Sequence, residues 1–377
     1  MATLNEKIKL FKRVIKKDAP LYVQYAVCKR CDLKCRMCQT VEARQHEREL
    51  ALPDIERLAD ILAELDVGVL VLSGGEPLMR KDLPEVVEAF TGRGISVRLQ
   101  TNATLATDRR VEALVDAGLE EVTVSLDTLD PSKQDYINGS PGSWARIMRG
   151  IAVFSRHLPR KGNMSGINIV VSRYNLDEIT SLIKFTTAIG FYASLIPVHL
   201  AGGSAGGAEY IVRTDAPEFA FTTEDFPRID ATYREILRMK KSGYLVYNST
   251  RFLRESPGFL KHRSVNWKCD SPNLYFSISP EGNFLPCVDL KTDKSMFKDD
   301  FISSYRSPEF TEEIRAMVSR CAGCMYACWP EITYLCRDPK VFTERMIQGV
   351  KVGRFKRTPM TREAMVKVAE EIRCGTA

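Results

Sequence analysis

The sequence of 377 residues predicts an α/β fold, in which a partial barrel of six parallel strands with their helices precedes a smaller cysteine-rich hairpin domain. Three observations lead to this prediction. Short apolar runs alternate with helical patterns over residues 21–200. Three closely spaced cysteines follow the first apolar run, and a second group of cysteines lies beyond residue 265.

The barrel prediction depends on regular alternation. The predicted helices carry apolar residues at the spacing of one helix face, as Ile55, Leu58 and Leu62 do. Such strand-helix repeats give parallel strands with right-handed crossovers, and six of them make an incomplete barrel rather than a full eight-unit one. The predicted strands are 21–27, 67–73, 95–101, 121–127, 166–172 and 193–200, and the predicted helices are 53–65, 83–90, 108–118, about 143–156 and 176–188.

The remaining segments define the expected domains. An amphipathic helix at the N-terminus carries Leu4, Ile8, Phe11 and Ile15 at helical spacing among lysines, so it either docks on the protein's own body or lies on a membrane surface. Residues 201–217 are rich in Gly, Ala and Pro and are expected to form a loop or lid. The expected divisions are 1–18 for the N-terminal helix, 19–215 for the barrel, 216–265 for a helical linker, 266–340 for the cysteine-rich domain and 341–377 for a helical tail.

The composition limits the compartment and the partners. A hydrophobic content of 44% is enough for a sizeable core. The N-terminus has no apolar signal region and the chain has no run of about 18 apolar residues, so we expect a cytoplasmic protein. In a reducing compartment, 11 cysteines indicate metal or redox chemistry rather than disulfides. A net charge of +6 does not by itself indicate a nucleic-acid partner.

The first cysteines lie in VCKRCDLKCRMC, residues 27–38. Cys31, Cys35 and Cys38 have the spacing C-x3-C-x2-C at the C-terminal end of the first strand, where the active sites of barrels are built. A tetrahedral zinc site needs a fourth ligand, which Cys28 could supply. Three thiolates without Cys28 would leave one corner of a cubane iron-sulfur cluster open.

The second predicted strand ends in SGGEPL, residues 73–78. A Gly-Gly pair lets the backbone approach a ligand closely, and Glu76 adds an acceptor for an ammonium group. With the cysteine spacing, this segment makes residues 20–200 resemble the radical S-adenosylmethionine (radical SAM) enzymes. In that family three cysteines hold a 4Fe-4S cluster, and S-adenosylmethionine chelates the fourth iron. The resemblance therefore assigns Cys31, Cys35 and Cys38 to the cluster.

The same resemblance implies further cofactor contacts. Two positions depart from the family pattern: Met37 stands where many members have an aromatic residue, and Asn138 stands where relatives often have arginine. The contact to the cofactor carboxylate is therefore left open. The resemblance assigns Gly74, Gly75, Glu76 and Pro77 to the methionine amino group, Asn102, Ser125 and Asp127 to the ribose or carboxylate, and the backbone at Ile196 and Pro197 to the adenine.

The C-terminal cysteines follow a second pattern. Cys269 and Cys287 flank a predicted hairpin whose turn is PEGN, residues 280–283. The C-x12-G-x4-C hairpin followed by C-x2-C looks like the SPASM or twitch extension of radical SAM enzymes, which binds auxiliary iron-sulfur clusters. A zinc ribbon is the alternative, because such thiolate sites accept either metal. The spacing favours one auxiliary 4Fe-4S cluster held by Cys269, Cys287, Cys321 and Cys324, with Cys328 as a replacement ligand or a spare thiol.

The resemblance implies an enzyme that reductively cleaves S-adenosylmethionine to a 5′-deoxyadenosyl radical, which takes hydrogen from an unactivated C–H bond. Its electron donor would be a protein such as flavodoxin or ferredoxin. An all-cysteine auxiliary cluster suits electron removal from a substrate radical, and so a net oxidation. Epimerisation is the other outcome considered, with Cys328 or Cys336 as hydrogen donor. The short segment before Cys31 favours a small biosynthetic intermediate as substrate over a peptide.

Three other functions stay open at the level of sequence. The chain could be a maturase of a ribosomally made peptide, or a transfer-RNA-modifying enzyme that uses its basic stretches at 7–17 and 351–357. It could also be a non-catalytic binding protein whose fold is stabilised by bound metals. Cleavage of S-adenosylmethionine by the reduced protein separates the last of these from an enzyme. Salt-sensitive binding of transfer RNA tests the second.

Overall fold

The structure is a computed structural model that describes residues 19–39, 48–160, 162, 164–200, 216–354 and 357–375. Six parallel strands form the expected partial barrel, in the order β6-β5-β4-β3-β2-β1. Each strand lies beside the one that precedes it in the chain, as single strand-helix crossovers require. The strands are β1 (Tyr22–Cys28), β2 (Val69–Gly74), β3 (Ser96–Thr101), β4 (Glu121–Ser125), β5 (Gly166–Val171) and β6 (Tyr192–Pro197).

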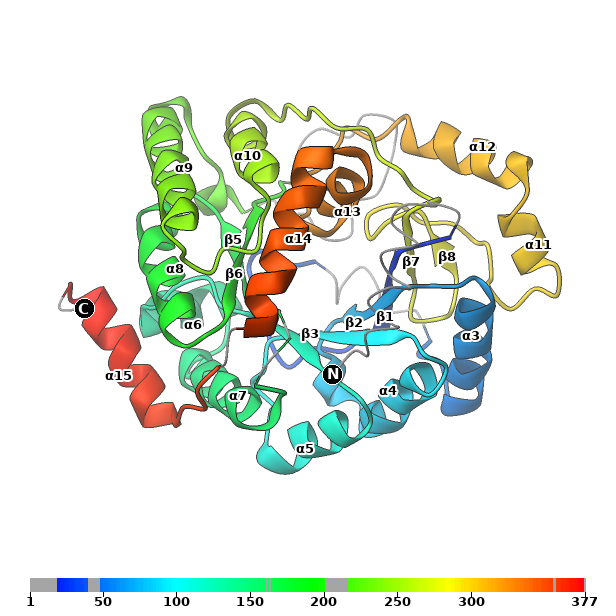
Figure 1. The fold of residues 1–377 in the computed structure, drawn as a ribbon, viewed down its shortest axis with the longest axis horizontal. Helices are drawn as coiled ribbons and strands as arrows, with labels where there is room; N and C mark the ends of the chain where they lie inside the picture. The colour runs from blue at the N-terminus through cyan, green and yellow to red at the C-terminus, as the bar shows by residue number, and fades with distance from the viewer. Residues whose placement is uncertain are drawn as a thin grey trace.

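The crossover helices lie along the outer face of this curved sheet (Figure 1). Helix α3 shows the reason, because Ile55, Leu58 and Leu62 form one apolar face and are fully buried. Burying each of these side chains contributes roughly 1.5–3 kcal/mol. The helices are α3 (Leu52–Glu64), α4 (Leu83–Thr91), α5 (Asp108–Asp116), α6 (Pro131–Asn138), α7 (Ser143–His157) and α8 (Ile179–Ala188), with the 3-10 turns η1 (Pro77–Met79) and η2 (Leu176–Glu178).

Helix α6 is the one barrel helix that the sequence analysis missed. It is short, and two of its three buried residues, Gln134 and Asn138, are polar, so its apolar periodicity is weak. Its ends are nevertheless marked in the sequence. Asp130 accepts hydrogen bonds from the N–H groups of Ser132 and Lys133 at the start, and Gly139 adopts a left-handed conformation after the last turn. These capping signals, rather than periodicity, could have predicted the helix.

The cysteine-rich hairpin is joined to the barrel sheet. Its strands β7 (Tyr275–Ile278) and β8 (Phe284–Leu285) are antiparallel, as the sequence predicts. Strand β7 also pairs parallel with β1, and Tyr22 lies opposite Tyr275. The eight strands therefore form one sheet, so hydrogen bonds cross between the segments expected to be the barrel and the cysteine-rich domain.

Helix α13 (Cys328–Arg337) covers the side of the barrel that the six strands leave open. At its first turn, the ring of Trp329 stacks on Tyr275 with centroids 4.8 Å apart. The same ring meets Tyr22 edge to face at 5.8 Å. These contacts fix the start of α13 against strands β1 and β7.

The other edge of the barrel is held through Glu331 of the same helix. One carboxylate oxygen of Glu331 accepts a hydrogen bond from the N–H of Ser249 at 2.7 Å, and the other lies 2.8 Å from the guanidinium of Arg345. The chain just before Ser249 runs along strand β6, where Val246 forms a parallel bridge with Ala193. Helix α13 therefore spans the opening between the two edge strands of the barrel.

Of the remaining described elements, helices α9, α10 and α12 lie in the upper part of Figure 1, and α15 lies at the lower left, against α7 and α8. No described helix is long and apolar enough to span a bilayer. The predicted N-terminal helix and nearly all of the predicted lid lie outside the described residues. The remaining elements are η3 (Pro217–Phe219), η4 (Thr223–Asp225), α9 (Phe226–Lys241), α10 (Thr250–His262), α11 (Phe301–Tyr305), α12 (Pro308–Val318), α14 (Pro339–Arg354) and α15 (Arg362–Arg373).

Candidate active site

The cysteine loop, residues 29–39, is held on one side by the end of strand β2. The N–H of Gly75 donates to the carbonyl of Cys28 at 2.6 Å. Gly74 has φ +128°, and a Cβ atom there would lie 2.1 Å from the same carbonyl oxygen. A Cβ atom on Gly75 would lie 2.1 Å from the carbonyl oxygen of Arg30. Only two glycines allow the backbones of β2 and the loop to pack this closely.

The other side of the cysteine loop rests on the C-terminal end of α6. The N–H groups of Lys34 and Arg36 donate to the carbonyls of Asn138 and Ile137 at 3.1 and 2.8 Å. Gly139 has φ +58°, and a Cβ atom there would lie 2.4 Å from the carbonyl oxygen of Lys34. The loop is therefore held by main-chain hydrogen bonds near its start and in its middle.

The three predicted cluster ligands, Cys31, Cys35 and Cys38, line one cavity of about 390 Å³ inside the barrel. Burial raises the pKa of Cys31 to about 12. Burial also raises the pKa of Cys35 well above its usual value, and the nearby Cys38 and Cys31 thiolates raise it further. Thiols in such a place need a bound cation to be held as thiolates, which is how iron-sulfur clusters are ligated.

Cys28, the fourth ligand that a zinc site would need, does not join this group. It is buried, and its thiol donates to Glu49 at 3.3 Å and to the carbonyl of Arg30 at 3.5 Å. Among the described residues, no three Cys, His, Asp or Glu side chains lie close enough together to share one metal ion. In a cubane each cysteine binds a different iron, so its ligands stand farther apart. Without Cys28, the three cavity thiols provide the three-cysteine ligand set of a cubane with one open corner.

Glu76 lies behind the cavity wall rather than on it. Its carboxylate is fully buried and accepts hydrogen bonds from the hydroxyl of Thr101 at 2.6 Å, the N–H of Asn102 at 2.7 Å and the N–H of Leu78 at 2.9 Å. Burial raises the pKa of Glu76 to about 7, although these hydrogen bonds oppose the shift. The side chain thus ties the end of β2 to the end of β3. Pro77 is also buried and is absent from the cavity lining.

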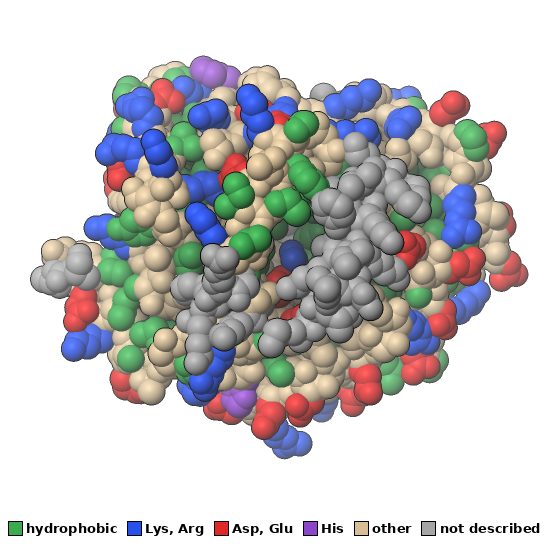
Figure 2. All heavy atoms as spheres, in the orientation of Figure 1, with side chains coloured by type: hydrophobic (Ala, Val, Ile, Leu, Met, Phe, Trp, Pro, Cys, Tyr) green, Lys and Arg blue, Asp and Glu red, His purple; other side chains and the backbone are tan. Residues whose placement is uncertain are grey.

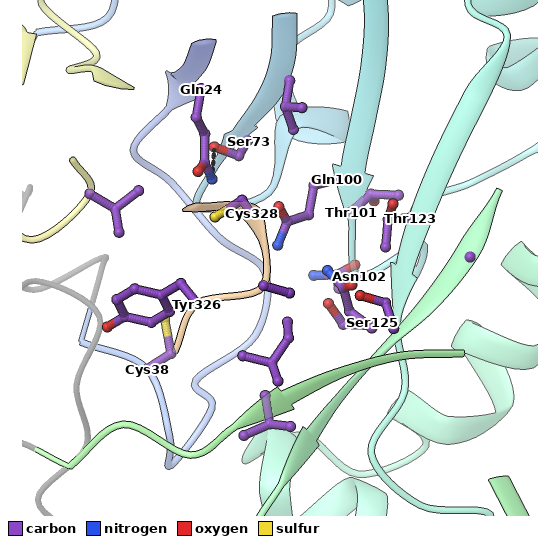
Figure 3. Close-up of a pocket in the computed structure, with 18 of the residues that line it drawn as sticks. Gln24, Cys38, Ser73, Gln100, Thr101, Asn102, Thr123, Ser125, Tyr326 and Cys328 are labelled. Atoms are coloured by element: carbon purple, nitrogen blue, oxygen red, sulfur yellow. Dashed lines mark hydrogen bonds between the residues drawn. The ribbon is translucent and has the colours of Figure 1, made fainter. Parts of the chain in front are cut away.

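The other predicted cofactor contacts do line the cavity. Asn102 donates to Asp32 at 2.9 Å, and its side-chain nitrogen lies 3.8 Å from the sulfur of Cys31. Figure 3 shows Asn102 and Ser125 at the ends of neighbouring strands. Asp127 accepts the N–H of Val170 at 2.7 Å, and burial raises the pKa of Asp127 to about 7. The predicted contacts on the lining are Gly74, Gly75, Asn102, Ser125, Asp127, Ile196 and Pro197.

Sequence reasoning missed the polar inner wall of the barrel. In Figure 3 the side chains of Gln24 and Ser73 meet through a hydrogen bond of 3.0 Å inside the cavity. Polar side chains also occupy alternate positions of β3 and β4, where successive residues point to opposite faces. The sequence signal for this wall was a polar residue at every second position of strands that are otherwise apolar. The polar wall residues include Gln24, Ser73, Arg98, Gln100, Glu121, Thr123, Asn168 and Ser194.

Four of the C-terminal cysteines form a separate group outside the cavity. Burial raises the pKa of Cys287, and the nearby Cys269 and Cys321 thiolates raise it further. Burial likewise raises the pKa of Cys324, with Cys287 and Cys269 nearby. The hydroxyl of Tyr275 donates to the sulfur of Cys269 at 3.3 Å. These four thiols are the predicted ligands of the auxiliary cluster; Cys269, Cys287 and Cys324 pack against one small core, and no three of the four lie close enough together to share a single metal ion.

Cys328 and Cys336 lie at opposite ends of helix α13. Cys328 lines the barrel cavity, and burial raises its pKa to about 12. Cys336 is buried in the small core that contains Trp329 and Tyr275 and is absent from the cavity lining. Of the two predicted hydrogen donors, only Cys328 therefore faces the place where a substrate would bind.

The family model of the radical SAM superfamily matches residues 25–186. The chain contains a radical SAM domain. The radical SAM match begins in β1, ends in α8 and includes the cysteine loop. A 4Fe-4S cluster and S-adenosylmethionine are the cofactors of such a domain, and the cavity thiols fit that cluster.

Similar proteins extend the comparison beyond the radical SAM domain. An AdoMet-dependent heme synthase of Methanosarcina barkeri is 33% identical over 178 residues, which are 47% of this chain and 50% of that protein. A second, of Oleidesulfovibrio alaskensis, is 26% identical over 322 residues, 81% of this chain and 80% of that one. The structure of Streptococcus suis SuiB bound to S-adenosylmethionine has a TM-score of 0.58 at 19% identity and covers 83% of this chain and 71% of SuiB. That similarity shows a shared fold.

Proposed function

We propose that this radical SAM enzyme cleaves S-adenosylmethionine reductively and carries out a net oxidation of a small biosynthetic intermediate. The bound cluster and S-adenosylmethionine would supply a 5′-deoxyadenosyl radical, which takes hydrogen from an unactivated C–H bond. One observation carries the proposal: Cys31, Cys35 and Cys38 share a cavity with Gly74 and Gly75, so cluster and nucleotide would meet in one enclosed space.

The residues of the chain have distinct tasks in this proposal. Gly74 and Gly75 expose backbone at the cavity for the methionine end of the cofactor. Asn102, Ser125 and Asp127 offer polar groups at neighbouring strand ends for its ribose or carboxylate. Glu76 acts indirectly in this arrangement, because its carboxylate orients the backbone at Asn102. Helix α13 keeps bulk water from the open side of the barrel, as radical chemistry requires.

Anaerobic reconstitution of the protein followed by reduction tests this function. Formation of 5′-deoxyadenosine from S-adenosylmethionine is the expected result. Cys35→Ser should abolish that product and the iron of the first cluster. Cys28→Ser is the matched control, since Cys28 is a buried cysteine bonded to Glu49, and its product formation should persist. Absence of 5′-deoxyadenosine from fully loaded wild-type protein would refute the proposal.

We further propose that the C-terminal region is a SPASM or twitch-type domain with one auxiliary 4Fe-4S cluster. The support is the grouping of Cys269, Cys287, Cys321 and Cys324 outside the cavity. Such a closed set of four thiolates would leave no open iron and would serve electron transfer. Iron and sulfide analysis should give two clusters per chain. Cys324→Ser should lose one of them and Cys328→Ser neither, and the opposite pattern would reassign Cys328 as a ligand.

Epimerisation is the alternative outcome, and the cavity position of Cys328 favours it as the hydrogen donor in that case. The S–H bond would break, its hydrogen atom would pass to the substrate radical, and the cysteine thiyl would regain an electron from the auxiliary cluster and a proton from solvent. Turnover in deuterium oxide distinguishes the outcomes. Product without deuterium at the reacting carbon supports oxidation. Deuterium there, lost in Cys328→Ala but kept in Cys336→Ala, supports epimerisation.

A second candidate function is the formation of heme that the names of two relatives indicate. The match to the Oleidesulfovibrio alaskensis protein covers 322 residues and so includes the C-terminal region as well as the barrel. The test is to incubate the reduced protein with heme precursors and measure heme and 5′-deoxyadenosine together. Deoxyadenosine in the absence of heme formation would leave the broader proposal in place and exclude this one.

The electron donor is proposed to be an acidic carrier such as flavodoxin or ferredoxin. Basic side chains are exposed on and beside the cysteine loop, among them Arg30, Lys34 and Lys81. Opposite charge would guide an acidic carrier to the first cluster. Lys34→Glu combined with Lys81→Glu should raise the KM for flavodoxin by roughly tenfold at low salt. The rate with dithionite should not change, and equal loss with both reductants would contradict a docking role.

A further inference from the structure

The cavity continues from the cysteine loop to the opposite end of the barrel. Its far end is built from residues at or near the start of their strands, including Tyr22 of β1, Glu121 of β4 and Tyr192 of β6. In a parallel sheet these positions share the N-terminal edge, whereas the cysteines lie beyond the C-terminal edge. In Figure 2 the visible face is hollowed near its centre, and a Lys or Arg side chain is seen inside the hollow.

Arg98 of strand β3 supplies the charge at this end. It is the one Lys or Arg among the described residues that line the cavity. Its side chain keeps 28% of its surface although it points into the barrel, so the free surface faces the cavity space. Nε of Arg98 lies 2.6 Å from a carboxylate oxygen of Glu121. Burial disfavours the charge, but Glu121 and the neighbouring Tyr247 and Tyr22 keep the pKa of Arg98 above its usual range.

The second acidic residue at this end is already compensated. Glu331 is buried and shares its two oxygens between Arg345 and the N–H of Ser249. Arg345 also lies over the ring of Tyr247, with its guanidinium carbon 4.4 Å from the ring centroid. Glu331 and Arg345 thus form a neutral pair that holds Tyr247 in place beside the cavity. Arg98 is left with Glu121 as its neighbouring carboxylate.

The ion pair with Glu121 is at Nε, and the two terminal nitrogens carry four of the five N–H donors of the guanidinium. The terminal nitrogens form the edge of the group that binds a planar carboxylate through two parallel hydrogen bonds. Tyr22, Tyr192 and Tyr247, from three separate segments, line the same end, and a tyrosine hydroxyl can donate to such a group. The chemistry at this end of the cavity is therefore that of a site for a substrate carboxylate.

We propose that Arg98 binds a carboxylate of the substrate at the N-terminal end of the barrel, opposite the cofactor. This inference depends on the proposed radical SAM function, because a bound carboxylate would determine which end of the substrate faces the cluster. Arg98 and Thr101 lie three positions apart on β3, which corresponds to about 10 Å along the strand. The carbon that loses hydrogen would therefore lie within roughly 10 Å of the carboxylate, toward the strand ends.

The competing explanation is that Arg98 and Glu121 only close the bottom of the barrel. The two explanations predict opposite effects of Glu121→Gln. If Arg98 binds a carboxylate, removal of the Glu121 charge should strengthen binding, since a competing and repelling anion is gone. If the pair is purely structural, the same change should give no binding and only a loss of stability.

Fluorine NMR of para-fluorobenzoate with the cluster-loaded protein and S-adenosylmethionine tests the site. Wild type should bind the carboxylate and not para-fluorobenzamide. Arg98→Gln should weaken binding about tenfold or more, as expected for the loss of a charge-assisted hydrogen bond. Arg98→Lys should bind with intermediate affinity, Glu121→Gln more tightly than wild type, and Arg156→Gln, an exposed surface control, like wild type.

Several results would overturn the inference. These are no binding of fluorobenzoate to wild type, equal binding of the amide, or unchanged affinity in Arg98→Gln. Iron content and unfolding temperature measured on every variant identify loss of folding, and Arg98→Lys retains the charge if Arg98→Gln does not fold. Cleavage of S-adenosylmethionine without substrate is measured in parallel. Wild-type protein that cleaves S-adenosylmethionine but does not bind fluorobenzoate would overturn the carboxylate site alone, so a failure of that site is distinguishable from a failure of the proposed function.

Discussion

At the scale of single residues, the backbone around the cysteine loop leaves no space for a side chain at Gly74 and Gly75. Both Cβ positions would fall 2.1 Å from a carbonyl oxygen of the loop or of its preceding strand. Backbone atoms on both sides are fixed by β1 and β2, so neither can retreat as a flexible side chain could. The Gly-Gly pair therefore positions the cysteines as well as offering backbone to a ligand.

Gly75→Ala should displace the cysteine loop and prevent the first cluster from forming. Iron analysis after anaerobic reconstitution should show the loss of one cluster and of 5′-deoxyadenosine formation. Gly258→Ala in helix α10 is the control, because no atom lies within 4 Å of its Cβ position and alanine in a helix stabilises by up to about 1 kcal/mol. Full iron content in Gly75→Ala would show that the loop can shift without harm.

Several of the residues that the sequence singles out line one cavity, because their spacing and their position after strands are local properties. Cys31 and Asn102 are examples, and they come within 3.8 Å of each other. The sequence does not predict that the carboxylate of Glu76 lies behind the cavity wall. That outcome depends on Thr101 and Asn102, which belong to the next strand and supply its hydrogen bonds. Arg98 was missed because one charged residue in a strand is ordinarily solvent-facing.

At the scale of elements, helix α13 covers the opening that two further strand-helix units close in a complete barrel. Its aromatic anchor is Trp329, which keeps 1% of its surface and contacts Tyr22 and Tyr275. The strand-helix alternation predicted the six parallel strands correctly. It did not predict how the open side is covered, because α13 and β1 are distant in the sequence and only tertiary packing joins them.

Trp329→Ala should remove this anchor and lower the free energy of unfolding by roughly 3–5 kcal/mol. Urea unfolding followed by circular dichroism measures the loss. Trp329→Phe retains an aromatic ring against Tyr275 and should lose less than half as much. A similar loss in both variants would show that the indole size, rather than the aromatic stack, determines the stability.

At the scale of the whole molecule, two buried carboxyl groups connect the fold to pH. Burial raises the pKa of Asp127 and of Glu76 to about 7. In the unfolded chain both groups have a pKa near 4. Between these values the folded protein holds protons that the unfolded chain has released. The contribution of these two groups to the free energy of unfolding is therefore greatest below about pH 4, and it is lost as the pH rises through about 7.

Asp127→Asn should weaken this pH dependence, since the amide stays neutral and its oxygen still accepts the N–H of Val170. For wild type, we expect the unfolding temperature to fall by about 5 °C between about pH 5 and pH 7.5. The variant should fall by roughly half of that, measured by calorimetry on the cluster-loaded protein. Asp116→Asn, an exposed carboxylate on α5, should behave like wild type. A steeper slope in Asp127→Asn would refute the assignment.

The pairing of β1 with β7 has a consequence for biosynthesis. Tyr22 and Tyr275 are neighbours in the sheet but stand about 250 residues apart in the chain, a separation that slows folding. At a translation rate of about 5–20 residues per second, β1 waits on the order of ten seconds or more for its second neighbour to be made. During that time one edge of the nascent sheet is open to other chains. Chaperone binding during synthesis should therefore be more important for the folding of this protein than for that of a barrel closed by consecutive strands.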